Sequence, residues 1–122
     1  MFSNLQINHE MPVYQQLCIY IKRLILKGEL KNGDVLPSRR ELASRLSINP
    51  NTVQKAYKAL EDEQLVHTIG NIKTKIEVDE EAILRIRREL VEEMVMVFIT
   101  QCKDSGVDFQ EAIFLMTKNW KS

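Results

Sequence analysis

Apolar residues recur at helical intervals in the first third of the chain. After Pro12 they keep a spacing of three and four residues until Gly28, which is a typical C-terminal stop, so a helix is predicted between them. Val35-Leu36-Pro37 is predicted to be extended, because the residue before a proline avoids the helical region. A short helix should follow at once, since Ser38 and Glu41 have the spacing of a capping box. The first eleven residues indicate little more than an extended arm.

The stretch from Asn49 to Asp62 has the pattern of a helix with one buried and one polar side. Asn49 is a favourable N-cap, and Pro50 suits the first helical position. The apolar residues that would face the core are Val53, Ala56, Tyr57 and Leu60. The opposite arc holds only amides and amines, namely Asn51, Gln54, Lys55 and Lys58. A short helix, a tight turn and a longer polar-faced helix together predict a helix-turn-helix.

Two β-rich runs follow this helix. Residues 65–69 and 72–78 are separated by Gly70-Asn71, which predicts a hairpin with a two-residue turn. A hairpin directly after a helix-turn-helix is the wing of a winged helix. Lys73 and Lys75 should lie on the same face of it, because side chains alternate along a strand.

The remaining residues predict two further helices, over 79–102 and from Asp108 onward. The first has two apolar stripes, and two helices are too few to bury both. We therefore predict that residues 79–122 dimerise, although the second stripe could instead pack on the protein's own winged helix. Phe98, Met116 and Trp120 could line a pocket, but aromatic and methionine residues at helical spacing more often form core. The residues predicted to contact a second subunit are Ile83, Leu90, Met94, Val95, Val97, Phe98, Phe109, Ile113 and Met116.

Charge is balanced over the whole chain but unevenly distributed. Residues 1–75 hold eleven Lys and Arg against seven Asp and Glu, a net of +4, whereas residues 76–122 hold six against ten, a net of −4. A basic first part suits a protein that meets nucleic acid with that part only. Cys18 and Cys102 lie on apolar stripes and are expected to be buried, reduced thiols. Without a long apolar run or a leader-like N-terminus, we expect a cytoplasmic protein.

Catalysis is not expected. His9 and His67 are far apart and have no paired nucleophile, and the sequence has no glycine-rich phosphate loop. No metal site or cofactor is predicted either. A winged helix that contacts proteins rather than DNA is the remaining alternative, and a steep dependence of binding on salt would separate the two.

Three motifs resemble the GntR family of winged-helix regulators. They are Leu36-Pro37-Ser38-Arg39-Arg40-Glu41-Leu42-Ala43, then Asn49-Pro50-Asn51-Thr52-Val53, then Ala56-Tyr57-Lys58-Ala59-Leu60-Glu61. The second motif, with so short a C-terminal region, is similar to the YtrA subfamily. This resemblance implies DNA contacts at Arg40, Asn49, Pro50, Asn51, Thr52, Gln54 and Gly70, and dimerisation through the tail. Many relatives have arginine at the positions of Pro50 and Gln54, and the usual glycine-rich hairpin tip is altered to Gly70-Asn71-Ile72-Lys73-Thr74.

The sequence thus predicts a mostly α-helical protein with a small β wing. Residues 1–78 would form a winged helix-turn-helix that binds double-stranded operator DNA, and residues 79–122 would form a dimerisation region with an unknown effector, if any. The chain would act as a repressor on an inverted repeat. The residues expected at the DNA are Ser38, Arg39, Arg40, Asn49, Pro50, Asn51, Thr52, Gln54, Lys55, Lys58, Gly70, Asn71, Lys73 and Lys75. Asn51 and Gln54 should favour adenine, because an amide can both donate to N7 and accept from N6.

Overall fold

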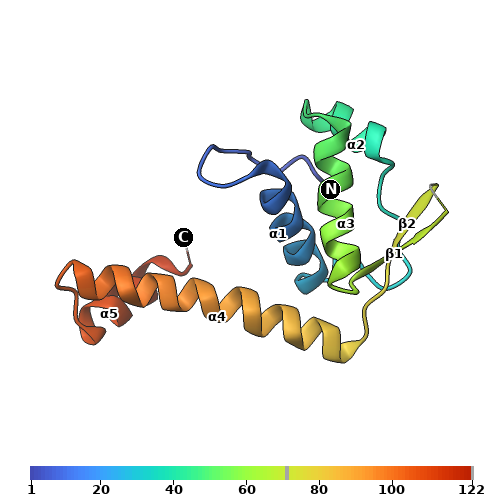
Figure 1. Cartoon of the computed structure of the whole chain (residues 1–122). Helices are drawn as coiled ribbons and strands as arrows, with labels where there is room; N and C mark the ends of the chain where they lie inside the picture. The colour runs from blue at the N-terminus through green and yellow to red at the C-terminus, as the bar shows by residue number, and fades with distance from the viewer. Residues whose placement is uncertain (71, 122) are drawn as a thin grey trace. The chain divides into compact units, whose positions relative to one another are not determined.

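Five helices and a two-stranded hairpin make up the computed structural model, which describes residues 1–70 and 72–121 (Figure 1). In chain order the elements are α1 (Val13–Leu26), α2 (Arg39–Leu46), α3 (Pro50–Asp62), β1 (Val66–Ile69), β2 (Lys73–Ile76), α4 (Glu80–Asp104) and α5 (Phe109–Asn119). The chain divides into two units, Met1–Ile86 and Arg87–Ser122, so the boundary falls within α4. The predicted fold class, a winged helix followed by two C-terminal helices, is confirmed.

The helix ends are fixed by the residues that predicted them. The Asn49 side chain accepts a hydrogen bond from the backbone N–H of Asn51 at 2.8 Å, and Pro50 is the first residue of α3. The Ser38 hydroxyl accepts from the N–H of Glu41 at 3.1 Å at the start of α2. After α1, Gly28 takes φ +76°, a left-handed conformation that glycine adopts without steric cost.

The core of the first unit forms around α3. Its four predicted core residues are all buried, and α1 contributes Leu17, Cys18, Ile21, Leu24 and Ile25. Figure 1 shows α3 between α1 and α2, with the hairpin at its C-terminal end. Leu36, Leu42, Leu65, Ile76 and Ile86 complete this core from the neighbouring segments. Because α1, α2 and the hairpin lie around α3 (Figure 1), the direction in which the polar side of α3 faces is fixed.

The hairpin is antiparallel, and its register differs from the prediction. Val66 pairs with Ile76 and Ile69 pairs with Lys73, so residues 70–72 separate the last pair and the predicted two-residue turn is wrong. The N–H of Ile72 bonds to the carbonyl of Ile69 at 3.3 Å, which places Ile72 in the turn although its side chain favours strands. Asn71 lies outside the described residues. Val35 pairs with Lys75, so the predicted extended piece extends the sheet beside β2.

The N-terminal arm packs on α1. Phe2 is buried, and its ring lies 5.7 Å from that of Tyr20, whose hydroxyl donates to the carbonyl of Met1 at 2.7 Å. The Gln16 amide donates to the carbonyls of Asn8 and Met11. This packing could not be predicted from the sequence, because the arm has too few apolar residues to form a periodic pattern.

The two C-terminal helices begin at aspartate caps. Asp79 accepts from the N–H of Ala82 at 2.8 Å before α4, and Asp108 accepts from the N–H of Glu111 at 2.9 Å before α5. Over residues 1–70 and 72–121, the structure has no helix that is both long and apolar enough to span a membrane. Both cysteines are free, but only Cys18 is buried, whereas Cys102 is half-buried, so the expectation of two buried thiols is wrong for Cys102.

Candidate DNA-binding surface

The polar arc of α3 faces outward as predicted. Asn51, Gln54, Lys55 and Lys58 are exposed, and Thr52 is half-buried. Asn49 and Pro50, at the start of the helix, are exposed too. This face combines hydrogen-bonding amides with two amines, which is the composition that base edges and phosphates require.

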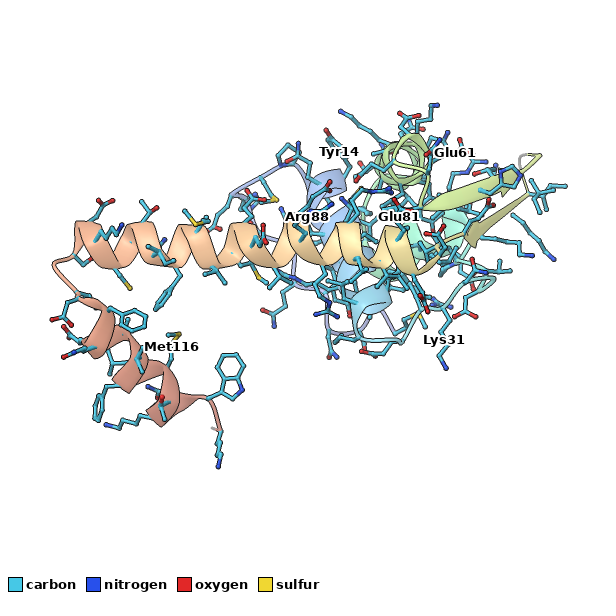
Figure 2. All side chains as sticks on the ribbon, turned by 90° about the horizontal axis from the view of Figure 1, so that it is seen from below. Tyr14, Lys31, Glu61, Glu81, Arg88 and Met116 are labelled. Atoms are coloured by element: carbon cyan, nitrogen blue, oxygen red, sulfur yellow. The ribbon has the colours of Figure 1, made fainter. Side chains whose placement is uncertain are left out.

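The two lysines of this arc have neighbours of their own. The Lys55 ammonium lies 4.4 Å from the centre of the Tyr14 ring on α1, in cation–π geometry, so Lys55 marks the α1 edge of the surface. Tyr14 is labelled on α1 in Figure 2. Lys58 donates to Asp62 at 2.9 Å, one turn further along α3. The hydrogen bond and then the negative charge of Asp62 raise the pKa of Lys58 above its ordinary value.

The start of α2 is tied to α3 by Tyr57. The Tyr57 hydroxyl donates to the carbonyl of Pro37 at 2.6 Å. Burial is the main cause that raises the pKa of the Tyr57 hydroxyl. Two residues later, the guanidinium of Arg39 donates to the side-chain oxygen of Gln54. Ser38 and Arg40 are exposed beside it, while Arg39 is half-buried. The structure therefore brings together residues of α2 and α3 that were predicted to contact DNA.

A cleft of about 240 Å³ separates α3 from the hairpin. Glu61 is the acidic residue that lines this cleft (Figure 2). The Glu61 carboxylate accepts a hydrogen bond from the backbone N–H of Thr68 at 3.1 Å. The Thr68 and Thr74 hydroxyls, on paired positions of β1 and β2, lie 3.3 Å apart. Glu61 thus ties the hairpin to α3, a role that sequence reasoning missed. The cleft is lined by Arg39, Gln54, Tyr57, Lys58, Glu61, Thr68, Gly70 and Thr74.

The hairpin directs its lysines away from the core. Lys73 is exposed and Lys75 half-buried, while the alternating residues Thr74 and Ile76 are buried. Gly70 takes φ +61° at the start of the turn, which favours glycine. The predicted alternation of Lys73 and Lys75 is confirmed, and their contact with DNA stays a prediction.

The second unit exposes most of its apolar residues. From Met94 to Ile99 every side chain is exposed, Phe109 at the start of α5 is 77% exposed, and Trp120, directly after α5, is 83% exposed. Ala112 is the only buried residue within residues 87–121. Of the residues predicted to contact a second subunit, Ile83 is half-buried against the core of the first unit and Leu90 is half-buried, whereas Met94, Val95, Val97, Phe98, Phe109, Ile113 and Met116 are exposed.

Phe98, Met116 and Trp120 are exposed, so the expectation that they form core is wrong. Phe98 and Met116 instead line an apolar groove of about 440 Å³ between α4 and α5, and Met116 is labelled on α5 in Figure 2. An adjoining groove of about 410 Å³ includes Trp120. Their side chains follow helical spacing but have no third element within the unit to cover them.

Comparison with known proteins identifies the family. Residues 13–76 match the model described as bacterial regulatory proteins, gntR family. The chain is 38% identical to the HTH-type transcriptional repressor YtrA of Bacillus subtilis over 101 residues, which cover 82% of this chain and 78% of the relative. It is 32% identical to the uncharacterized HTH-type regulator YhcF of the same organism, with 88% and 89% covered.

A solved structure gives the same result at the level of the fold. A GntR family transcriptional regulator from Listeria monocytogenes superimposes with a TM-score of 0.83 at 28% identity, over 92% of this chain and 98% of that one. The family and these relatives are transcription regulators, not enzymes. The chain belongs to the GntR family of bacterial regulatory proteins and is a DNA-binding transcriptional regulator similar to YtrA.

Proposed function

We propose that this regulator is a homodimeric repressor that binds an inverted-repeat operator, with α3 of each subunit in a major groove. The observation that supports dimerisation is the exposed apolar surface of α4 and α5. A continuous run of exposed apolar residues from Met94 to Ile99, together with Phe109 and Trp120, is costly to leave in water. A second copy of the same surface is the simplest cover, because a two-fold axis pairs one patch with itself.

The DNA contacts are proposed from the polar surface of the first unit. Asn51 would contact a base edge from the exposed start of α3, where recognition helices approach the groove floor. Arg40 and Ser38 would bind phosphates beside it. Lys73 and Lys75 would bind the backbone from the hairpin, while Lys55 and Lys58 would hold phosphates at the edges of α3.

Repression would follow from occupancy of the operator. A dimer bound over a promoter excludes polymerase from the same DNA. The repressor named YtrA in Bacillus subtilis is similar over most of its length, which supports repression over activation. A change in the angle between the two subunits would release the DNA, because both recognition helices must fit half-sites at a fixed spacing.

Selection of binding sites from randomised duplex tests this proposal. We expect enriched sequences with dyad symmetry and half-site centres about one helical turn apart. Asn51→Ala should relax base preference at one symmetric pair of positions, at about 1–3 kcal/mol for each lost bidentate contact. Enriched sites without dyad symmetry would contradict the dimeric operator, and unchanged preference in Asn51→Ala would remove that residue from base contact.

A further inference from the structure

Arg39 and Gln54 form a contact that changes what Gln54 can offer to a base. The Arg39 guanidinium donates to the Gln54 side-chain oxygen, and both residues line the cleft between α3 and the hairpin. Gln54 is exposed on the polar side of α3, and Arg39 is half-buried at the first position of α2. The pair therefore joins the first turn of one helix to the outward face of the other.

The surrounding contacts fix this arrangement. Tyr57 lies three residues after Gln54, so the two are neighbours on the surface of α3 although Tyr57 is buried, and the Tyr57 hydroxyl donates to the carbonyl of Pro37 at 2.6 Å. Ser38 then caps the N–H of Glu41 at 3.1 Å, which sets the direction of the first turn of α2. Arg39 lies between these anchors, so its backbone is fixed at the start of α2 and its guanidinium reaches Gln54 through their hydrogen bond.

A free glutamine amide suits adenine, because its oxygen accepts from N6 while its nitrogen donates to N7. In this protein the oxygen already accepts from a cation. An adenine N6 group approaching its other lone pair would meet the N–H groups of the guanidinium, which are also donors. With its oxygen engaged by Arg39, the exposed Gln54 side chain offers a base the donors of its amide nitrogen.

We infer that Arg39 and Gln54 act as one specificity-determining unit that selects guanine rather than adenine in each half-site. Guanine presents two neighbouring acceptors, O6 and N7, in the major groove, whereas thymine presents one acceptor beside a methyl group. The inference rests on the proposed function, in which α3 enters the major groove. Arg39 is the positioning residue: it occupies the acceptor of Gln54 and so sets which base Gln54 can contact.

The test is binding-site selection with the full chain and three variants. Gln54→Ala identifies the base position that the pair contacts, because preference there should disappear. At that position we expect the wild type to prefer guanine over adenine by about tenfold or more. Arg39→Met, which keeps an unbranched apolar stem but removes the donors, should shift the preference toward adenine. Arg40→Met removes the same charge from the next residue and should lower affinity without changing the base at this position.

Two results would overturn the inference: adenine in the wild type at the position defined by Gln54→Ala, or an unchanged guanine preference in Arg39→Met. The wild-type base decides the matter even if Arg39→Met folds poorly, which circular dichroism would reveal. Failure of the proposed function would look different, because enriched sites would then lack dyad symmetry while still reporting the base opposite Gln54. The two failures are thus separate in one data set.

Discussion

The Tyr57 ring is 4% exposed, and its hydroxyl is the donor that holds Pro37. Tyr57→Ala should lower the free energy of unfolding by about 3–5 kcal/mol, as other buried aromatic truncations do. Tyr57→Phe keeps the ring but leaves the Pro37 carbonyl without this donor, so about 1 kcal/mol is expected. Urea unfolding measures both. Gln54→Ala is the control, because it removes only an exposed hydrogen bond with Arg39 from the outward face, and it should unfold close to the wild type. Equal losses in all three would mean that the two faces of α3 are misassigned.

Cys18 gives the fold a dependence on alkaline pH. Burial raises the pKa of its thiol to about 11 from an ordinary value near 9, and its Sγ donates to the carbonyl of Ala56 at 3.4 Å. Because the folded pKa lies above the unfolded one, this contribution to stability is complete below about pH 9 and declines as pH rises toward 11. The free energies of unfolding of the wild type and of Cys18→Ala should therefore converge as the pH rises from about 9 to about 11. A constant difference between them would exclude the Cys18 thiol as the titrating group.

At the residue scale, local chemistry was predictable and long-range pairing was not. The caps at Ser38 and Asn49 follow from spacing within a few residues, because the bonds they make are local. The Arg39–Gln54 and Glu61–Thr68 contacts join residues of different elements. They depend on how α2 and the hairpin pack on α3, which helical periodicity does not specify.

Among the elements, the hairpin depends on one acidic anchor. The Glu61 carboxylate accepts from the Thr68 N–H at 3.1 Å, in a half-buried position. Glu61→Ala should leave this amide without its acceptor and speed its hydrogen exchange by about fivefold, equivalent to about 1 kcal/mol. Glu61→Gln retains a side-chain oxygen and should exchange more slowly than Glu61→Ala. Equal exchange rates at Thr68 in all three proteins would show that Glu61 does not anchor β1.

The exposed lysine of β2 should act on every DNA sequence alike. Lys73→Ala should weaken binding to all duplexes and reduce the slope of log affinity against log salt by about one, since one phosphate contact is lost. Fluorescence anisotropy over a salt series measures that slope. Lys118→Ala, which removes an exposed lysine from α5, should leave the slope unchanged. An unaltered slope in Lys73→Ala would remove the hairpin from the DNA contact.

Element order and type were predictable, but the hairpin turn was not. Each helix carries its own apolar stripe and caps, so its presence follows from the sequence. The position of the turn between Ile69 and Lys73 is decided by strand register. Ile72 lies in this turn, although isoleucine is a residue type that favours strands. Register is set by the partners of β2, including Val35 from a distant segment.

For the whole molecule, the apolar surface of α4 should determine the number of subunits. Val97→Glu places a charge in the exposed run from Met94 to Ile99 and should give monomers, because a buried unpaired charge is costly. Arg88→Glu is the matched control: it introduces the same side chain nine residues earlier, about half a turn around the helix. Sedimentation equilibrium should find Arg88→Glu dimeric like the wild type. A dimeric Val97→Glu protein would place the interface elsewhere.

The surplus of apolar surface in residues 79–122 was visible in the sequence, because two stripes cannot be buried by two helices. The structure of one chain leaves that surface exposed, with Ile83 alone of the predicted set packed on the first unit's core. A pattern in one chain can indicate that a partner is needed, but the geometry of the assembly depends on contacts between chains.

Sedimentation velocity on a labelled duplex that carries the selected operator tests whether two chains bind one operator. We expect the wild-type protein to be a dimer at tens of micromolar and to bind as two chains to one duplex. We also expect a duplex with only one half-site to bind much more weakly. A wild-type protein that is monomeric at that concentration, or that saturates the full operator with one chain, would show that the repressor does not act as a dimer.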